Sequence, residues 1–409
     1  MTVLVRRLAV LSLHTSPLAQ PGSGDSGGMN VYVRELVSAL AQAGVASDVY
    51  TRRWRDDLPA TVDVEPGVRV VHVEAGPPDL PKEALAEVVD AFTAGVHGAI
   101  DPATDALHAN YWLSGVAGHA LKHRLDLPLV STFHTLARVK AETGDPEPQR
   151  RVRAEAEVIG CSDALLASCT AEAAQLRELY GADPERIEIV PPGVEHAFFS
   201  PGDRAGARAA LAHLGPFEGA VLLFVGRIQP LKGLDVAVRA LAQLDDQRAV
   251  LLVVGGASGQ RGRAEVERVQ KLAAAAGVGD RVRFTDPQPH HLLSTFYRAA
   301  DVVLVPSRSE SFGLVGLEAA ACGTPVVAAA VGGLRTLVDH GRTGFLVEGR
   351  DPAVFAAYVE QITGNPALAR ELSTRAATRA RGYTWSTTAA RLRRIYADIT
   401  ARSLVECRA

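Results

Sequence analysis

Short apolar runs alternate with helical patterns along almost the whole chain, and this alternation limits the fold more than any other feature. The runs are rich in Val, Leu and Ala and lie at residues 8–13, 46–50, 68–73, 105–109, 129–132, 186–190, 221–225, 249–254, 282–284, 302–305 and 325–329. Strands that alternate with helices predict parallel sheets joined by right-handed crossover connections. The chain is 409 residues long, which is enough for two domains of ordinary size.

Proline and glycine residues divide this pattern into two sets. Pro191-Pro-Gly193 and Pro201-Gly202 bracket a short polar stretch, which is typical of an interdomain hinge. We therefore expect an α/β protein with two Rossmann-like domains facing a cleft, one over residues 1–200 and one over residues 201–385. A further helical pattern begins at Ser386.

Composition and charge disfavour several kinds of partner. The formal net charge is −3, which does not favour binding to nucleic acid or to a membrane surface. No apolar run approaches the roughly 20 residues that span a bilayer, and the N-terminal residues lack the order of a signal peptide. The cysteines show no metal-type spacing, so we expect reduced thiols in a cytoplasmic protein; they are Cys161, Cys169, Cys322 and Cys407.

The stretch after the apolar run at residues 302–306 predicts a phosphate-binding loop. A helix is expected from Phe312 to Ala321, and the unpaired amides and positive dipole at its start suit a phosphate. Glu310 precedes this helix and Glu318 lies within it. Their carboxylates can therefore accept hydrogen bonds from hydroxyl groups at the two ends of one ligand. The alternative is that Glu310 only stabilises the first helical turn and that Glu318 is a surface residue.

Other strand ends also predict ligand contacts. The glycine-rich turn at residues 21–28 lies between a strand and a helix, although it matches neither GxGxxG nor a Walker A loop. Arg227 and Lys232 flank another such turn and could neutralise a diphosphate. The alternative for the glycine-rich turn is a flexible loop without a ligand, and the alternative for Arg227 and Lys232 is two solvated surface cations. In open α/β sheets ligands lie beyond the carboxyl ends of strands, where the sequence also places His14, Gly28, Tyr111 and His134.

Several motifs resemble those of retaining glycosyltransferases of the GT-B fold, in family 4. The longest runs over nineteen residues from Glu310 to Ala328, and Gly226-Arg-Ile-Gln-Pro-Leu-Lys-Gly233 resembles the family's diphosphate motif. Residues 14–33 and Tyr111-Trp-Leu-Ser-Gly115 are similar to the actinobacterial D-inositol 3-phosphate glycosyltransferases of mycothiol synthesis. Residues 132–140 are also similar to bacterial sucrose-phosphate-synthase-like enzymes. The resemblance implies a C-terminal helix that crosses back, so that residues 386–409 pack on the N-terminal domain.

The resemblance implies roles for particular donor-site residues. Gly28 would offer its amide to the donor β-phosphate, Arg227 and Lys232 would hold the diphosphate, Glu310 would face the sugar and Glu318 would hold the ribose. The whole implied donor set is His14, Gln20, Gly27, Gly28, Arg227, Lys232, Gln288, Glu310, Phe312, Gly313, Leu314, Val315 and Glu318. The implied catalytic set is His134, Arg227, Lys232 and Glu310, with a purely structural histidine as the alternative for His134.

The implied acceptor set is Asn30, Lys82, Tyr111, Thr135 and Arg151, of which the last four match residues that hold the acceptor phosphate in the inositol-phosphate enzymes. Two segments depart from the family. His108-Ala-Asn-Tyr replaces the usual His-Ser-His-Tyr, and Ser131-Thr-Phe-His replaces His-Thr-Ala-His. Because these changes line the acceptor side, the acceptor can differ while the donor motifs are complete.

The resemblance implies transfer with retention, with UDP-N-acetylglucosamine and 1D-myo-inositol 3-phosphate as the first expected substrates. Stabilisation of charge on the departing diphosphate would drive the reaction, with no metal and no cofactor besides the nucleotide sugar. Neither nucleic acid nor membrane is expected as a partner, and a homodimer is suggested. The alternatives are another nucleotide sugar with a sugar-phosphate, aminocyclitol or natural-product acceptor, a pyridoxal-phosphate phosphorylase, and a non-catalytic nucleotide-sugar-binding protein.

Overall fold

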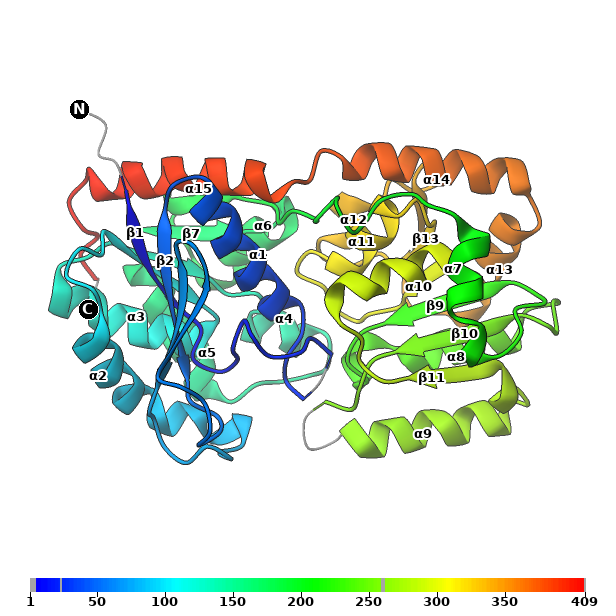
Figure 1. Ribbon diagram of the computed structural model, residues 1–409, viewed down its shortest axis with the longest axis horizontal. Coiled ribbons are helices and arrows are strands. Elements are labelled where there is room, and N and C mark those ends of the chain that lie inside the picture. The colour runs from blue at the N-terminus through cyan, green and yellow to red at the C-terminus, as the bar shows by residue number, and fades with distance from the viewer. Residues whose placement is uncertain (1–4, 23, 259–261, 408–409) are drawn as a thin grey trace. The chain divides into compact units, whose positions relative to one another are not determined.

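The computed structural model describes residues 5–22, 24–258 and 262–407, which form two compact units (Figure 1). Unit 1 contains residues up to Ala19, then Met29–Gly193 and the segment from Trp385 onward. Unit 2 contains Gln20–Gly28 and Val194–Thr384, so the glycine-rich turn belongs to unit 2 rather than to the N-terminal domain in which the sequence boundaries placed it. Ser23 of that turn and residues 408–409 of the terminal segment lie outside the described residues. Within the described chain, no helix is both long and apolar enough to cross a bilayer.

Unit 1 is built on an eight-stranded sheet. Its strand order is β3-β4-β2-β1-β5-β6-β7-β8, and all neighbours are parallel except β3 and β4. The strands are β1 (Arg7–Leu11), β2 (Ala46–Arg52), β3 (Thr61–Glu65), β4 (Val68–Val73), β5 (Ala106–Asn110), β6 (Leu129–Thr132), β7 (Ala164–Ala167) and β8 (Ile187–Ile189). The order reverses between β1 and β5, which is therefore the topological switch point of this sheet.

Helices cover both faces of this sheet, and alternate residues of β1 show it. Leu8 and Val10 pack in one core cluster, whereas Ala9 and Leu11 pack in another. The first cluster includes residues of α1 and of the C-terminal helix α15, so α15 packs within unit 1. The helices of this unit are α1 (Gly28–Gln42), α2 (Val89–Ala99), α3 (Trp112–Leu125), α4 (Ala137–Glu142), α5 (Gln149–Cys161), α6 (Thr170–Tyr180) and α15 (Trp385–Thr400).

Unit 2 is built on a six-stranded parallel sheet with the order β11-β10-β9-β12-β13-β14. Counted within the unit this is 3-2-1-4-5-6, the doubly wound order of dinucleotide-binding proteins, with its switch point between β9 and β12. The strands are β9 (Val221–Val225), β10 (Val250–Val254), β11 (Val282–Thr285), β12 (Val302–Val305), β13 (Val326–Ala329) and β14 (Gly344–Val347).

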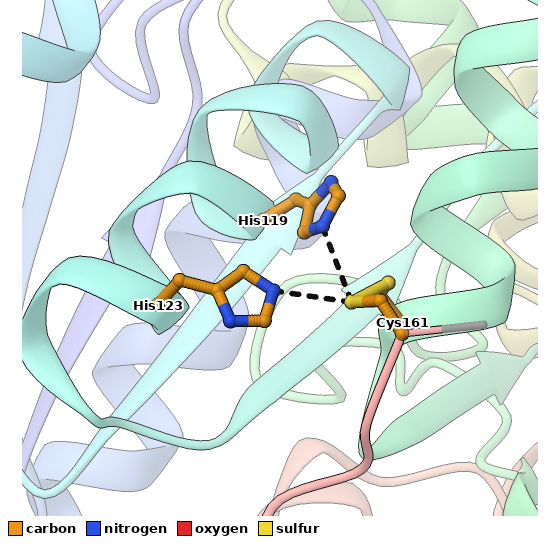
Figure 2. Close-up of side chains that lie close together, drawn as sticks. His119, His123 and Cys161 are labelled. Atoms are coloured by element: carbon orange, nitrogen blue, oxygen red, sulfur yellow. Dashed lines mark hydrogen bonds between the residues drawn. A yellow bond between two sulfur atoms is a disulfide. The ribbon is translucent and has the colours of Figure 1, made fainter. Parts of the chain in front are cut away.

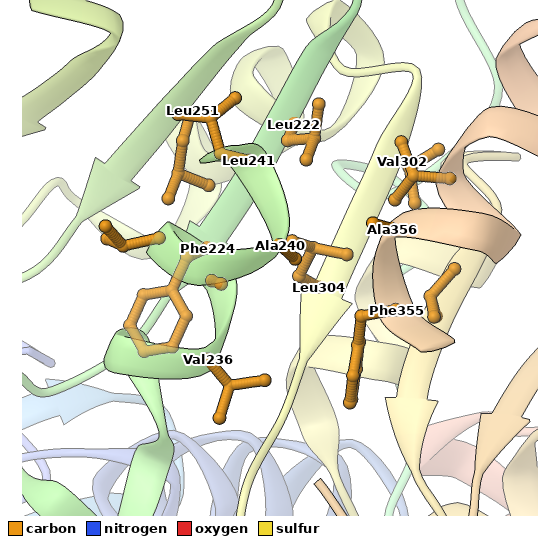
Figure 3. Close-up of a cluster of buried hydrophobic side chains, with 14 of the residues drawn as sticks. Leu222, Phe224, Val236, Ala240, Leu241, Leu251, Val302, Leu304, Phe355 and Ala356 are labelled. Atoms are coloured by element: carbon orange, nitrogen blue, oxygen red, sulfur yellow. The ribbon is translucent and has the colours of Figure 1, made fainter. Parts of the chain in front are cut away.

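The core of unit 2 joins the sheet to its helices. Figure 3 shows Leu222 and Phe224 of β9 beside Val236 and Leu241 of the following helix, all at most 4% exposed. Two helices begin at side-chain caps. Asp351 and Asn365 each accept hydrogen bonds from backbone amides, and a proline follows each at the first helical position. The helices are α7 (Arg204–Ala210), α8 (Leu234–Ala242), α9 (Gly262–Ala275), α10 (Leu293–Ala299), α11 (Leu314–Ala321), α12 (Leu334–Leu337), α13 (Pro352–Thr363) and α14 (Pro366–Ala380).

The structure contains three strands that the sequence analysis did not identify, β3, β7 and β14. β3 is an exposed antiparallel edge strand, and its mostly polar residues give no apolar run. β7 and β14 are four-residue apolar strands, as short as β6 and β12, which the analysis did identify. The expected helix at residues 312–321 begins instead at Leu314, because Gly313 has a left-handed φ of 95° and acts as its N-cap.

Candidate functional site

Three of the predicted donor residues lie at the switch point of unit 2. Arg227 and Lys232 follow β9, and Glu310 follows β12, the two strands between which the order reverses. Crevices at such points bind ligands in doubly wound sheets because the loops diverge there beyond the strand ends. The topology therefore places these charged side chains where a nucleotide would be expected.

Lys232 and Glu310 contact each other directly. Nζ of Lys232, which ends the 3₁₀ helix η4 (Pro230–Lys232), donates to Oε1 of Glu310, and Oγ of Ser307 donates to the same oxygen over 2.9 Å. The lysine and glutamate side chains are 24% and 14% exposed, so water screens the pair only partly. An ammonium carries three N–H donors, which allows Lys232 to bind Glu310 and a phosphate oxygen together.

Two glycines after β13 hold the backbone of the Glu310 loop. A Cβ on Gly332, whose φ is +45°, would lie 1.8 Å from the carbonyl oxygen of Glu310. A Cβ on Gly333 would lie 2.3 Å from Cα of Phe312, and its amide donates to the Glu310 carbonyl over 3.1 Å. Only residues without a side chain permit this approach. The sequence analysis assigned no role to either glycine.

The start of α11 follows this loop. Leu314 and Val315 are its first two residues, and helix-start amides have no partner within their own helix. The ring of Phe312 is 4% exposed and packs against Tyr383 at 5.6 Å between centroids. Phe312 therefore supports the loop from the core, whereas the helix start offers backbone donors.

Glu318 is buried, so the alternative of a surface glutamate is wrong. It is 5% exposed, and its two oxygens are held by Nε2 of His290 at 2.7 Å and by the hydroxyl of Tyr297 at 2.7 Å. Burial, together with the Glu318 carboxylate, raises the pKa of Tyr297 well above its ordinary value, which keeps the hydroxyl protonated as a donor. The sequence analysis missed both partners. The signal that could have found His290 is its position, five residues past the end of the strand β11.

The glycine-rich turn contacts the same loops of unit 2. A Cβ on Gly27 would lie 3.1 Å from Nε of Arg227, and one on Gly28 would lie 3.5 Å from Cδ1 of Leu314. Nη1 of Arg227 donates to the carbonyl of Asp25 over 3.3 Å. The structure therefore brings the turn, Arg227 and the start of α11 together.

Gln20 and Gln288 bridge the two ends of this region. Nε2 of Gln20 donates to the backbone carbonyl of Gln288 over 2.5 Å, and Nε2 of Gln288 donates to the carbonyl of Asp286 over 2.9 Å. With this pair, every member of the predicted donor set except His14 lies in unit 2. His14 and the predicted catalytic residue His134 lie in unit 1.

Unit 1 gathers the predicted acceptor residues around Tyr111. Tyr111 follows β5 and has a φ of 75°, and its ring lies 4.4 Å from that of His14, which follows the neighbouring strand β1. Nζ of Lys82 lies 5.9 Å and Cζ of Arg151 lies 5.0 Å from the ring centroid. Two cations around one aromatic ring at a switch point suit an anion.

Arg151 is held rigidly. It is 2% exposed, and its guanidinium donates to Glu155 over 2.7 Å and to the carbonyl and hydroxyl oxygens of Thr135 over 3.0 and 3.1 Å. Glu147 pairs with it over 2.9 Å. Fork-shaped bonding of this kind fixes the plane of the group, so Thr135 and Arg151 act as one unit.

His134 is neutral at ordinary pH. Its Nε2 lies 2.9 Å from Oδ1 of Asn110, and burial, aided by nearby His108, lowers its pKa to about 3. Burial likewise lowers the pKa of His108 to about 3, and its two ring nitrogens contact Thr132 at 2.8 Å and Tyr396 of α15 at 2.7 Å. His108 thus joins Thr132 to the terminal helix, while Asn110 and His134 form a separate pair.

Asn30 has a local structural contact. It is 2% exposed, and its Nδ2 donates to Oγ1 of Thr15 over 2.6 Å and to the carbonyl of Ser16 over 2.5 Å. These bonds hold the segment after β1, so Asn30 positions the loop that carries His14. Its predicted contact with the acceptor stays a prediction.

The expectation of four reduced thiols is wrong for two of them. Cys161 and Cys407 form a disulfide across 246 residues, whereas Cys169 and Cys322 are free and buried. Figure 2 shows His119 and His123 pointing at one sulfur of this disulfide, Sγ of Cys407. No sequence spacing signalled this, because folding brings the chain terminus to the end of α5.

Comparison with known proteins identifies the family to which this chain belongs. Residues 213–380 match the model for glycosyl transferases group 1, and residues 27–193 match that for the glycosyl transferase 4-like domain. A D-inositol 3-phosphate glycosyltransferase of Acidothermus cellulolyticus is 49% identical over 97% of this chain and 91% of its own. One of Geodermatophilus obscurus is 50% identical over 94% of this chain and 87% of its own.

Solved structures agree with the fold. Sucrose-phosphate synthase from Thermosynechococcus elongatus is 33% identical over 97% of this chain and 99% of its own, with a TM-score of 0.90. Anabaena HepE in complex with UDP and glucose has a TM-score of 0.77 at 20% identity, over 96% of this chain and 100% of its own. At that identity the second likeness shows the fold alone.

Proposed function

We propose a specific reaction on the premise that this chain belongs to the family-4 glycosyltransferases of the GT-B fold, among the relatives of the D-inositol 3-phosphate glycosyltransferases. The reaction transfers N-acetylglucosamine from its UDP derivative to 1D-myo-inositol 3-phosphate with retention of anomeric configuration. The observation that carries the proposal is the Lys232–Glu310 pair beside Arg227 at the switch point of unit 2.

The donor residues have complementary tasks. Arg227 and Lys232 neutralise the diphosphate as the bond from the sugar C1 to the phosphate oxygen breaks, and the amides at the start of α11 add donors. Glu310, held by Lys232 and Ser307, accepts hydrogen bonds from hydroxyl groups of the sugar. Glu318 accepts a ribose hydroxyl in exchange for part of its bonding to His290.

Retention requires that the acceptor oxygen attacks the face that the diphosphate leaves. In this arrangement the departing phosphate oxygen takes the acceptor proton, so no protein base is needed. His134 fits that scheme as a neutral hydrogen-bonding residue, because a histidine with a pKa of about 3 is a poor general base near neutral pH. The site needs only the nucleotide sugar, without a further cofactor.

The acceptor side supports a phosphorylated polyol. Lys82, Arg151 and Tyr111 form a cationic wall with a polar edge, which suits a phosphate next to hydroxyl groups. The reaction would take place in the cytoplasm, where nucleotide sugars are made.

Two observations favour a second acceptor. The chain is 33% identical to a sucrose-phosphate synthase over nearly its whole length, and residues 108–110 depart from the inositol-phosphate pattern at the acceptor side. A sugar phosphate would present the same phosphate and hydroxyl groups to Lys82 and Arg151.

One experiment separates these candidates. Purified chain is incubated with UDP-, GDP- and ADP-sugars, each paired with myo-inositol 3-phosphate, free myo-inositol or fructose 6-phosphate, and products are identified by mass and by anomeric proton coupling. We expect an α-linked N-acetylglucosaminyl inositol phosphate from UDP-N-acetylglucosamine alone. Product from fructose 6-phosphate only would favour the second acceptor, and an inverted product would refute retention.

A further inference from the structure

Four side chains that commonly bind metals meet beside the C-terminal half of α3 (Figure 2). His119 and His123 lie one turn apart on α3, Cys161 ends α5, and Cys407 lies in the tail after α15. Their ligand atoms all lie within 4.8 Å of one another. We propose that this His119–His123–Cys161–Cys407 cluster, when its two cysteines are reduced, binds one Zn²⁺ ion as a structural site.

The distances fit a tetrahedral zinc ion. Zn–S bonds of about 2.3 Å and Zn–N bonds of about 2.0 Å give edges of roughly 3.3–3.8 Å between neighbouring ligands. Nε2 of His123 lies 3.1 Å and Nε2 of His119 lies 3.3 Å from Sγ of Cys407. Both imidazoles already aim Nε2 at Sγ of Cys407, so the histidines need only follow that sulfur by side-chain rotation when the ion enters.

The sulfurs must separate, and the tail can supply that movement. Sγ atoms bound to one zinc ion lie about 3.8 Å apart, against about 2.0 Å in a disulfide. Residues 403–407 form neither helix nor strand, whereas Cys161 is buried at the end of a helix. Movement of Cys407 alone therefore opens the site while α3 and α5 stay in place.

The buried charges nearest to the cluster balance each other. Lys122, between the two histidines on α3, is fully buried and paired with Asp163 at 2.8 Å. Asp163 also accepts a hydrogen bond from the backbone amide of Val405 over 2.7 Å, which fixes the tail beside the cluster. One Zn²⁺ and two thiolates add no net charge to this neutral pair, and exposed His123 leaves an entry path from solvent.

The disulfide and the metal exclude each other, and the exchange balances. A dithiol reductant passes two electrons and two protons to the Cys161–Cys407 bond, so that two thiols form and the dithiol closes to its own disulfide. Zn²⁺ then displaces both thiol protons to solvent and binds the thiolates and two neutral imidazoles. The disulfide seen here is the oxidised state of the same cluster.

Four protein ligands leave no open coordination position, which marks a structural rather than a catalytic ion. The cluster is also remote from the acceptor residues, because His119 lies eight residues along α3 from Tyr111, about 12 Å at the helical rise. In either state the cross-link ties the C-terminal tail to α3 and α5. Its effect is on the stability of unit 1.

The test uses the full chain, reduced with a dithiol, stripped with a chelator and separated from both without oxygen. Titration with Co²⁺ should give cobalt–thiolate charge-transfer absorption and tetrahedral bands that saturate at about one ion per chain and vanish on adding Zn²⁺. Cys407→Ser and His123→Asn should lose most of this signal. The matched controls Glu406→Ser in the tail and His97→Asn at an exposed position of α2 should keep it.

Thermal unfolding supplies the second measurement. Zn²⁺ should raise the Tm of the reduced chain and leave that of Cys407→Ser unchanged, because only a ligand of the folded state stabilises it. The oxidised chain should bind no cobalt at the cluster. Octahedral cobalt spectra in the reduced chain, or equal cobalt binding by Cys407→Ser and Glu406→Ser, would overturn the proposal.

Discussion

Gly332→Ala tests whether the backbone behind Glu310 determines transfer activity. The added Cβ would lie 1.8 Å from the Glu310 carbonyl oxygen, and real contacts of this kind do not fall below 3.0 Å, so the loop must move by at least about 1.2 Å. Misplacement by about 1 Å at a reacting centre can cost on the order of 100-fold in rate. The left-handed φ adds about 1–2 kcal/mol of strain, which affects stability.

Gly341→Ala is the matched control. Gly341 also has a left-handed φ, +75°, but nothing lies within 4 Å of a Cβ placed there. Both variants should lose about 1–2 kcal/mol of unfolding free energy from backbone strain by urea denaturation, and Gly332→Ala should lose more because its Cβ also clashes. Only Gly332→Ala should lose roughly 100-fold in kcat/KM for the nucleotide sugar.

A third variant separates contact from strain. Gly333→Ala keeps an ordinary φ but places its Cβ 2.3 Å from Cα of Phe312, so it should lose activity in the same way. If Gly332→Ala and Gly341→Ala are equally active, the position of the loop does not limit the reaction and the reasoning fails.

Three further predictions follow from the two sites. Lys232→Met should lower kcat by about 100- to 1,000-fold with an unchanged circular dichroism spectrum, since it removes charge stabilisation of the leaving group; near-normal turnover would exclude that role. Tyr297→Phe should cost about 1–3 kcal/mol of unfolding free energy and raise the donor KM, because a buried Glu318 oxygen loses its donor; an unchanged melting curve would contradict this. His108, with its pKa lowered to about 3, stays neutral when folded but is protonated below about pH 6.5 when unfolded. Stability should therefore fall as pH drops from about 6.5 towards 3, by about 1.4 kcal/mol per unit from His108 and by a similar amount from His134, and His108→Gln should remove only the His108 share in urea titrations.

Motifs of adjacent residues were accessible from the sequence. The strand, loop and helix around Glu310 predicted a phosphate-binding loop, and the family motifs identified Arg227 and Lys232. The helix caps Asp351 and Asn365 are likewise contacts between near neighbours in the chain, although the sequence analysis did not single them out.

Contacts between residues far apart in the chain could not be predicted from the sequence. The sequence could not show that Glu318 is buried between His290 and Tyr297, because an acid inside a helix has the same local pattern at the surface. It also could not show that Gly332 supports Glu310, since that depends on two loops meeting at one sheet edge.

The sequence by itself determined the alternating α/β pattern and the chemical identity of the charged residues at the strand ends. The tertiary structure alone decided which of them meet: Lys232 with Glu310 across 78 residues, and Cys161 with Cys407 across 246. The physical reason is that strand order in a parallel sheet is set by packing of the whole unit. Neighbours in space at a switch point are therefore seldom neighbours in the chain.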